Sequence, residues 1–204
     1  MAPIEDNRLV IATHNRGKMS EIAESLDGLG LKITSSAELN PFLHAPEEIH
    51  ETFLENALLK ARVCYQATGC LTLADDSGLE VDALHGRPGV RSARYAGENA
   101  SSEAMIAKVL SELQGVPEEE RQARFVCVVA LVGPGVERTF RGTCEGTIAR
   151  VPQGAGGFGY DPIFLDPESG MTFSEMTAHE KSERSHRGRA LLQVRDYLRQ
   201  IQLA

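Results

Sequence analysis

In the first third of the chain, apolar and polar positions follow first the pattern of a strand and then that of a helix, and this order repeats. Residues 8–13 form a short apolar run rich in branched side chains, which predicts a buried strand. Apolar residues then recur at the period of a helix from Met19 to Leu29 and again over residues 52–68, with a short predicted strand at 31–35 between them. This order of strands and helices predicts an α/β protein.

The rest of the chain adds further strands and two helices. The predicted strands cover residues 70–74, 79–84, 124–132 and 137–148, and the predicted helices cover residues 101–113 and the segment from Leu191 to Ile201. Gly133-Pro134-Gly135 joins the last two strands, which predicts an antiparallel hairpin attached to a parallel core. Because no repeat and no long linker interrupts these elements, residues 1–204 are expected to form a single domain.

Composition limits the class of protein. With 204 residues, 42% of them hydrophobic, the chain is long enough to bury a sizeable core. No run approaches the about 18 apolar residues of a membrane helix, and no export signal is evident, so we expect a cytoplasmic protein without a membrane partner. The formal net charge of −8 argues against general binding of nucleic acid. The four cysteines lack Cys-x-x-Cys pairing and are expected to be reduced core residues.

Two adjacent carboxylates, Asp75 and Asp76, stand where the predicted strand 70–74 ends, and Ser77 and Gly78 follow them. In an α/β protein, ligands bind where strands end. On an extended chain the two carboxylates point to opposite faces, so only one would face a given cleft. A bound divalent cation would relieve the repulsion between them. The alternative is that these four residues are only a polar turn.

The segment between the first predicted strand and the first predicted helix is a candidate phosphate site. His14-Asn15-Arg16-Gly17-Lys18 lies where a helix start directs backbone N–H groups and the positive end of its dipole at a ligand. Lys18 adds a full positive charge. The spacing differs from that of a Walker A motif, and an ordinary strand-to-helix turn is the alternative.

Two later segments suit a nucleotide. The glycine-rich stretch from Gly154 to Pro162 allows a close approach of backbone to ligand, and its Phe158 and Tyr160 are able to stack on a planar base. The alternative is a mobile loop whose aromatic rings dock on the protein itself. Residues 180–190 gather cations where a helix begins, a conflict that a bound anion would relieve. A solvated basic turn is the alternative there.

Taken together, these segments resemble the inosine/xanthosine triphosphate pyrophosphatase family. The resemblance covers nearly the whole chain, in order and with family-like spacing. The matching motifs are Thr13-His14-Asn15-x-Gly17-Lys18, Glu51-Thr52-Phe53-x-Glu55-Asn56-Ala57-x-x-Lys60-Ala61, Ala74-Asp75-Asp76-Ser77-Gly78-Leu79, Ser92-Ala93-Arg94-Tyr95, Gly157-Phe158-Gly159-Tyr160-Asp161-Pro162, and Glu180-Lys181-Ser182 with Ser185-His186-Arg187-Gly188. His14 stands at a position where relatives also have glycine, and its imidazole is given no special role.

The resemblance implies an elongated mixed β-sheet flanked by helices, with two lobes and the active cleft between them. It also implies a homodimer that uses Mg²⁺ to cleave ITP, dITP and XTP to the nucleoside monophosphate and pyrophosphate. Such an enzyme removes deaminated purines from the nucleotide pool before polymerases use them.

The resemblance also implies site residues, position by position. Asp76 is the expected proton acceptor and a metal ligand, and Glu48 is the expected second metal carboxylate, with Glu47 as the alternative. The expected substrate-binding residues are Thr13, His14, Asn15, Arg16, Gly17, Lys18, Ser77, Phe158, Gly159, Tyr160, Asp161, Lys181, His186 and Arg187.

The chemistry of these residue types agrees with that assignment. Cleavage between the α- and β-phosphates needs an in-line water, a base, and positive charge on the leaving pyrophosphate. Lys18 and Lys60 can supply that charge, although a solvated Lys60 is the alternative. Donors near His186 and Arg187 would favour the 6-oxo group of inosine and xanthine over the 6-amino group of adenine. A nucleotide-binding protein without catalysis and a pyrophosphatase for modified pyrimidine nucleotides are the rival interpretations.

Overall fold

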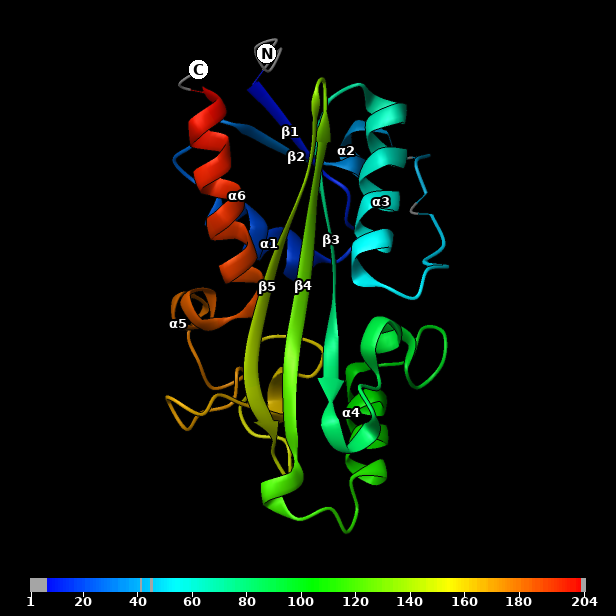
Figure 1. Cartoon of the computed structure of the whole chain (residues 1–204), viewed down its shortest axis with the longest axis vertical. Helices are drawn as coiled ribbons and strands as arrows, with labels where there is room; N and C mark the ends of the chain where they lie inside the picture. The colour runs from blue at the N-terminus through cyan, green and yellow to red at the C-terminus, as the bar shows by residue number, and fades with distance from the viewer. Residues whose placement is uncertain (1–6, 41, 45, 203–204) are drawn as a thin grey trace. The chain divides into compact units, whose positions relative to one another are not determined.

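The computed structural model describes residues 7–40, 42–44 and 46–202 (Figure 1). The chain groups into two compact units. Unit 1 comprises Met1–Asp76, Cys127–Gly142 and Arg187–Ala204, and unit 2 comprises Ser77–Val126 and Thr143–His186. This division agrees with the two lobes that the family resemblance implies.

Within the described residues, six strands form one sheet in the order β2-β1-β3-β4-β5-β6. The strands are β1 (Arg8–Ile11), β2 (Lys32–Ser35), β3 (Leu71–Val81), β4 (Gln122–Gly133), β5 (Val136–Ile148) and β6 (Phe164–Leu165). β1 pairs in parallel with β2 and with β3, whereas β5 and β6 pair antiparallel. The sheet is therefore mixed, and the predicted α/β fold class is confirmed.

In unit 1, helices cover both faces of the sheet (Figure 1). They are α1 (Arg16–Ser25), α2 (Ser36–Leu39), α3 (Phe53–Thr68) and α6 (His186–Gln202). Apolar residues of α1 and α6 share one core cluster with Leu71 and Leu73 of β3. On the other face of β3, Thr72 Oγ1 donates a hydrogen bond to Cys64 Sγ of α3 at 3.8 Å. Successive β3 residues therefore face different helices, as the pleat of a strand requires.

Unit 2 is built around aromatic side chains. Its helices are α4 (Ser102–Glu112) and α5 (Ala178–Arg184). The ring centroid of Phe125 lies 4.5 Å from that of Phe164 and 5.9 Å from that of Phe173. The imidazole of His186 stacks on the same Phe125 ring at 4.6 Å. These contacts give unit 2 a core of its own.

The prediction of a strand end after Ala74 is wrong. β3 continues through Asp75, Asp76, Ser77 and Gly78 to Val81, and the strand predicted at 79–84 is its last part followed by a short 3₁₀ helix, Asp82–Leu84. The chain stays extended because the two carboxylates meet lysine and arginine side chains on the two faces of the strand. The polar-turn alternative is wrong for the same reason.

Other predicted elements are confirmed. The helix predicted at 52–68 is α3, and the Thr52 side chain caps it by accepting a hydrogen bond from the Glu55 backbone N. The helix predicted at 101–113 is α4, which Ser101 caps. β4 and β5 are joined through a tight turn in which Gly135 has a φ of +72°. β1 ends at Ile11 rather than at Thr13.

Two predictions made for the whole chain, on membrane helices and on the cysteines, can be compared with the described residues. None of the helices described there has the length and apolar character needed to cross a bilayer. None of the four cysteines, which all lie in the described ranges, forms a disulfide, and Cys64, Cys127 and Cys144 are buried, as expected for reduced core residues.

Arg121 is a buried cation that holds backbone carbonyl groups. It is 3% exposed, and its Nε donates to Ile148 O at 2.7 Å, while its two Nη atoms donate to Leu113 O at 3.0 Å and to Ala149 O at 3.1 Å. Burial lowers its pKa. Arg121 therefore joins the end of β5 to the end of α4 within unit 2.

Replacing this guanidinium should destabilise the fold. In Arg121→Met two buried carbonyl groups and the partly buried carbonyl of Ala149 lose their donors, so the free energy of unfolding should fall by about 2–4 kcal/mol. Arg124→Met is the matched control, because Arg124 makes partly exposed ion pairs with Asp82 and Glu145 and its loss should cost less than about 1 kcal/mol. Urea unfolding of both variants measures the difference, and equal losses would contradict this role of Arg121.

Candidate functional site

The segment between β1 and α1 is organised by Asn15. Its side-chain oxygen accepts a hydrogen bond from the Lys18 backbone N at 3.0 Å and so caps α1, while its own backbone N donates to Thr13 Oγ1 at 3.2 Å. The first turn of α1 carries Arg16 and Lys18 and no acidic residue. The N–H groups of this turn and the positive end of the helix dipole therefore favour an anion.

An open groove of about 450 Å³ runs along this segment. Four predicted substrate-binding residues line it, namely Thr13, His14, Asn15 and Arg16, together with Ser35 at the end of β2 and Glu38 of α2. The structure thus brings these predicted residues together on unit 1.

Asp75 is almost fully enclosed by cations. It is 2% exposed, and its Oδ2 lies 3.0 Å from Lys18 Nζ and 3.2 and 3.3 Å from Nη2 and Nε of Arg187. Burial alone would raise the pKa of Asp75, but Lys18, Arg187 and Lys60 together hold it well below its usual range. Asp75 is therefore an ionised carboxylate whose Oδ2 is held in ion pairs with Lys18 and Arg187.

Arg187 is buried in ion pairs, whereas direct contact with a substrate requires an accessible side chain. Its side chain is 2% exposed, and besides Asp75 it pairs with Glu21 of α1 at 2.5 Å. The contact between Arg187 and the base that the motifs imply stays a prediction.

Asp76 faces the opposite side of β3 and has a different environment. Its Oδ1 accepts a hydrogen bond from Lys60 Nζ at 2.8 Å, and the same ammonium donates to Glu48 Oε1 at 2.9 Å. Burial raises the pKa of Asp76 to about 6, which Lys60 opposes and Glu48 reinforces. Within the part of the chain that the structure describes, the buried Asp76 Oδ2 has no hydrogen-bond partner. Asp76 is therefore a buried carboxylate with one oxygen that lacks a hydrogen-bond partner in this part of the chain, and its pKa is raised where that of Asp75 is lowered.

α3 positions Lys60 and the segment that carries Glu48. Asn56, one turn before Lys60, bonds the backbone N and O of His50 through its side-chain amide, both at 3.1 Å. Lys60 is 8% exposed, so the solvated alternative for this side chain is wrong. Burial would lower its pKa, but Asp76, Asp75 and Glu48 outweigh this effect and raise it. Of the two candidate carboxylates, Glu48 reaches Lys60, while Glu47 is exposed.

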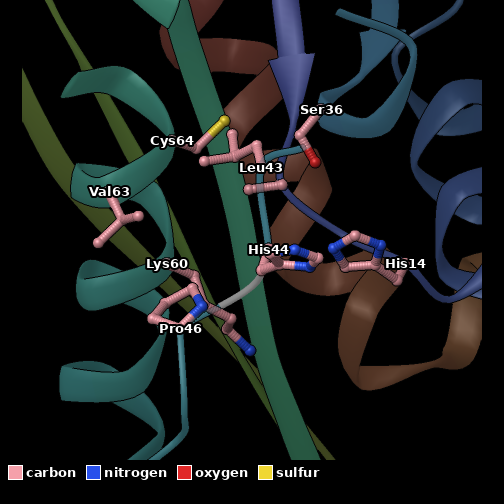
Figure 2. A pocket seen from close by; sticks show the side chains of 9 residues that line it. His14, Ser36, Leu43, His44, Pro46, Lys60, Val63 and Cys64 are labelled. Carbon is pink, nitrogen blue, oxygen red and sulfur yellow. The ribbon is translucent and has the colours of Figure 1, made fainter. Parts of the chain in front are cut away.

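Figure 2 shows a small cavity beside Lys60. The imidazoles of His14 and His44 point toward each other across it, and Ser36 and Cys64 also line it. Its interior of about 10 Å³ has room for roughly one water molecule. The segment after β1 and the segment that leads to Glu48 therefore lie side by side in unit 1.

In unit 2, Asp161 organises the glycine-rich segment. Asp161 is buried, and its Oδ2 accepts hydrogen bonds from the Phe158 backbone N and from Lys181 Nζ, both at 2.7 Å. The Lys181 ammonium also lies 4.5 Å from the centroid of the Phe158 ring. Gly157 has a φ of +72°, and a Cβ there would come 2.2 Å from Asp161 Oδ2. Glycine is therefore required for the chain to fold over this carboxylate.

Two other predicted residues of unit 2 are buried in its core. Tyr160 is 4% exposed, and its hydroxyl donates to Ser92 O at 2.9 Å. Its ring is docked on the protein, so the expectation that Tyr160 offers a stacking surface is wrong for this conformation. The His186 imidazole is stacked on Phe125. Ser77 follows Asp76 in β3 as the first residue of unit 2.

Phe158 remains partly exposed and lines an open groove of about 540 Å³ in unit 2. Gly159 lines the same groove, together with Ile106 and Leu110 of α4. Unit 2 therefore brings together Phe158, Gly159, Asp161 and Lys181 of the predicted set.

Sequence reasoning missed residues that act through another residue. Asp75 was given no role, although it holds Lys18. Asn56 was named only as part of a motif, and Glu21 was not named. A signal existed for both, because Asn56 stands four residues before Lys60 and Glu21 three residues after Lys18, spacings that share a helix face.

No group of three or more metal-binding side chains occurs among residues 7–40, 42–44 and 46–202. The pair Asp76 and Glu48 supplies two carboxylates instead, a set that suits Mg²⁺ when phosphates and water complete its shell. A mixed sheet with a capped, cation-rich helix start beside such a pair defines an α/β protein of the class that handles phosphorylated ligands.

Comparison with known proteins identifies the family. The Ham1 family model matches residues 9–197. A dITP/XTP pyrophosphatase from Geobacter sulfurreducens is 54% identical over 192 residues, which cover 94% of this chain and 96% of that protein. A dITP/XTP pyrophosphatase from Bacillus subtilis is 49% identical over 183 residues, which cover 89% and 92% of the two chains. The chain belongs to the Ham1 family.

Solved structures agree with this result. The Ham1 protein of Staphylococcus aureus matches with a TM-score of 0.85 and 40% identity, and a HAM1 protein from Coxiella burnetii with a TM-score of 0.86 and 42% identity. Each match covers 95% of this chain and 98% of the other. The resemblance stated from the motifs is therefore confirmed.

Asp76→Asn should change how stability depends on pH in the metal-free protein. The pKa of Asp76 in the folded chain, about 6, is above its ordinary value of 3.8, so the folded chain holds this proton more tightly than the unfolded chain. Its contribution to stability is therefore present below about pH 4 and lost as pH rises through about 6. From pH 4.5 to 7.5 the difference in unfolding free energy should shift in favour of the variant by about 1–3 kcal/mol.

Urea unfolding in EDTA at several pH values across this range measures the shift. Glu47→Gln is the control, because it neutralises an exposed carboxylate next to Glu48 and leaves Asp76 in place. A constant difference for Asp76→Asn would show that Asp76 does not titrate in this range.

Proposed function

We propose that this chain hydrolyses ITP, dITP and XTP, with Mg²⁺, to the nucleoside monophosphate and pyrophosphate. It is a nucleoside triphosphate pyrophosphatase, and its relatives carry the name dITP/XTP pyrophosphatase. The observation that carries the proposal is the Asp76 site: a buried carboxylate with a raised pKa and an unused oxygen, next to a second carboxylate and a lysine.

The roles in unit 1 follow from geometry and charge. The start of α1 and the Lys18 ammonium bind phosphate oxygens, because this turn offers N–H donors and no negative charge. Asp76 accepts the proton of the attacking water. In the metal-free chain the pKa of Asp76 is raised to about 6, so this carboxylate is ionised at neutral pH and able to accept a proton. Lys60 orients the Asp76 carboxylate through its hydrogen bond to Oδ1.

The residues around Asp76 fit a hard divalent cation. Carboxylate oxygens of Asp76 and Glu48 would hold Mg²⁺, and the buried Asp76 Oδ2 has no hydrogen-bond partner among the described residues. Mg²⁺, when bound, supplies positive charge to the phosphate oxygens of the substrate. Lys60 keeps the two carboxylates in place before the cation arrives, since it bonds both.

Recognition of the base is assigned to unit 2. The partly exposed Phe158 ring offers a stacking surface, and the Lys181 ammonium lies over that ring. A donor at this position suits the 6-oxo group of inosine or xanthine and opposes the 6-amino group of adenine. Asp161 fixes both residues, because it bonds the Phe158 backbone and the Lys181 ammonium.

A homodimer and a cytoplasmic location remain part of the proposal through the family resemblance. Large apolar side chains are exposed on the segment that carries Glu48 and on the first turn of α3, including Phe42, Ile49 and Leu54. An exposed apolar surface of this kind supports association with another chain.

The direct test is a panel of nucleoside triphosphates assayed with Mg²⁺ for pyrophosphate and orthophosphate release. We expect pyrophosphate as the primary product, with ITP, dITP and XTP turned over faster than ATP or GTP. Asp76→Asn should lower turnover at least ~100-fold with the fold retained, because it removes the proton acceptor. Orthophosphate as the primary product would overturn the proposal.

Metal dependence separates the two candidate glutamates. EDTA should abolish activity and Mg²⁺ or Mn²⁺ should restore it, because oxygen-rich sites select hard cations. Glu48→Gln should raise the Mg²⁺ concentration needed for half-maximal activity at least ~10-fold, the usual scale for losing a metal ligand or its support. Glu47→Gln should leave it nearly unchanged. Equal effects of the two changes would show that the segment, rather than the Glu48 carboxylate, is what matters.

A further inference from the structure

Asp75 takes no part in the proposed hydrolysis, although its carboxylate is more deeply buried than those of Asp76 and Glu48. Its side chain is 1% exposed, and one oxygen, Oδ2, faces Lys18 at 3.0 Å and Arg187 at 3.2 Å. The thiol of Cys127 lies on the same oxygen at 3.9 Å. This oxygen is therefore fully surrounded by protein, which leaves no room there for a water or an ion to react.

Lys18 is fixed at two points. Its backbone N donates to Asn15 Oδ1 at 3.0 Å, and its ammonium pairs with Asp75. Within the described part of the chain no other side chain pairs with this ammonium, so two of its three donors are left for a ligand. Its side chain is 17% exposed, which gives a ligand access to those donors.

Arg187 is a second cation at the Asp75 carboxylate, so this carboxylate does not pair with Lys18 alone. The guanidinium approaches the same Oδ2 through two nitrogens, and its third nitrogen pairs with Glu21 on α1. Because Asp75 divides its charge between two cations, Lys18 keeps part of its own charge for an anion. Glu21 stands one turn after Lys18, so the same network also holds α1 against β3.

We propose that Asp75 is a positioning residue, which holds the Lys18 ammonium ready for the phosphate groups at the start of α1. The proposal rests on the function above, because it takes a phosphate chain as the ligand of Lys18. A free lysine loses side-chain entropy when it binds a ligand, whereas a lysine held by Asp75 has lost most of it on folding. Asp75 thus acts through Lys18 and touches neither the water nor the metal.

Inorganic pyrophosphate is a suitable probe, because it carries the phosphate groups without a base. Titration calorimetry should show that Asp75→Asn and Lys18→Met each weaken pyrophosphate binding at least about tenfold, the loss expected for a charge-assisted contact. In the variant that carries both changes, Asp75→Asn should add less than about twofold to the effect of Lys18→Met. Glu137→Gln, which neutralises an exposed carboxylate of unit 1, should leave binding unchanged.

Additive losses in this double-mutant cycle would overturn the proposal, because a purely structural Asp75 would act whether or not Lys18 is present. Absence of pyrophosphate binding by the wild-type chain would also overturn it. Failure of the proposed function would give a different result. The wild-type chain would then bind pyrophosphate with this coupling and yet release none from any nucleotide.

Kinetic measurements with ITP are a second test of the positioning role of Asp75. Asp75→Asn should raise KM more than it lowers kcat and should keep the acidic limb of the pH profile, whereas Asp76→Asn should remove that limb. Loss of the limb in Asp75→Asn would make Asp75 a base and refute the positioning role. If Asp75→Asn does not fold, Asp75→Asn with Arg187→Met removes the cation left without its carboxylate and allows the same cycle with Lys18→Met.

Discussion

Two adjacent carboxylates can remain in the interior of this protein only because each one meets its own cations. The pleat of β3 turns Asp75 toward α1 and α6 and Asp76 toward α3, so Lys18 and Arg187 compensate one charge and Lys60 the other. If the strand turned after Ala74, the two charges would share one surface. The positions of three helices around β3 therefore serve one requirement, the separation of two like charges that are next to each other in sequence.

The number of cations around each carboxylate decides what it can do. Asp75 shares one oxygen between a lysine and an arginine, and its pKa is held well below the usual range. Asp76 shares a single lysine with Glu48, and burial raises its pKa to about 6. Chemically identical side chains on neighbouring residues thus become a fixed structural anion and a group able to exchange a proton. Environment rather than residue type sets the roles.

The local sequence pattern predicted the elements that are determined by interactions between residues close in sequence. The helical period and the Thr52 cap gave α3, and apolar runs gave the strands of an α/β sheet. Local pattern failed where distant residues decide. Asp-Asp-Ser-Gly favours a turn by itself, but Lys18 and Arg187, far away in sequence, keep it in a strand. Tyr160 looked like an exposed ring, yet Ser92 supplies a buried acceptor for its hydroxyl. No periodicity contains that information, because it arises from tertiary packing.

The proposed hydrolytic residues and the proposed base-recognising residues belong to different compact units of the chain. Asp76, Glu48, Lys18 and Lys60 lie in unit 1, whereas Phe158, Asp161 and Lys181 lie in unit 2 with a core of its own. Natural selection can therefore alter the choice of base without disturbing the carboxylates that carry out cleavage. That freedom has a limit at Gly157, where any side chain would collide with Asp161. Divergence of specificity in such a lineage has to run through the residues around this glycine while the glycine itself stays.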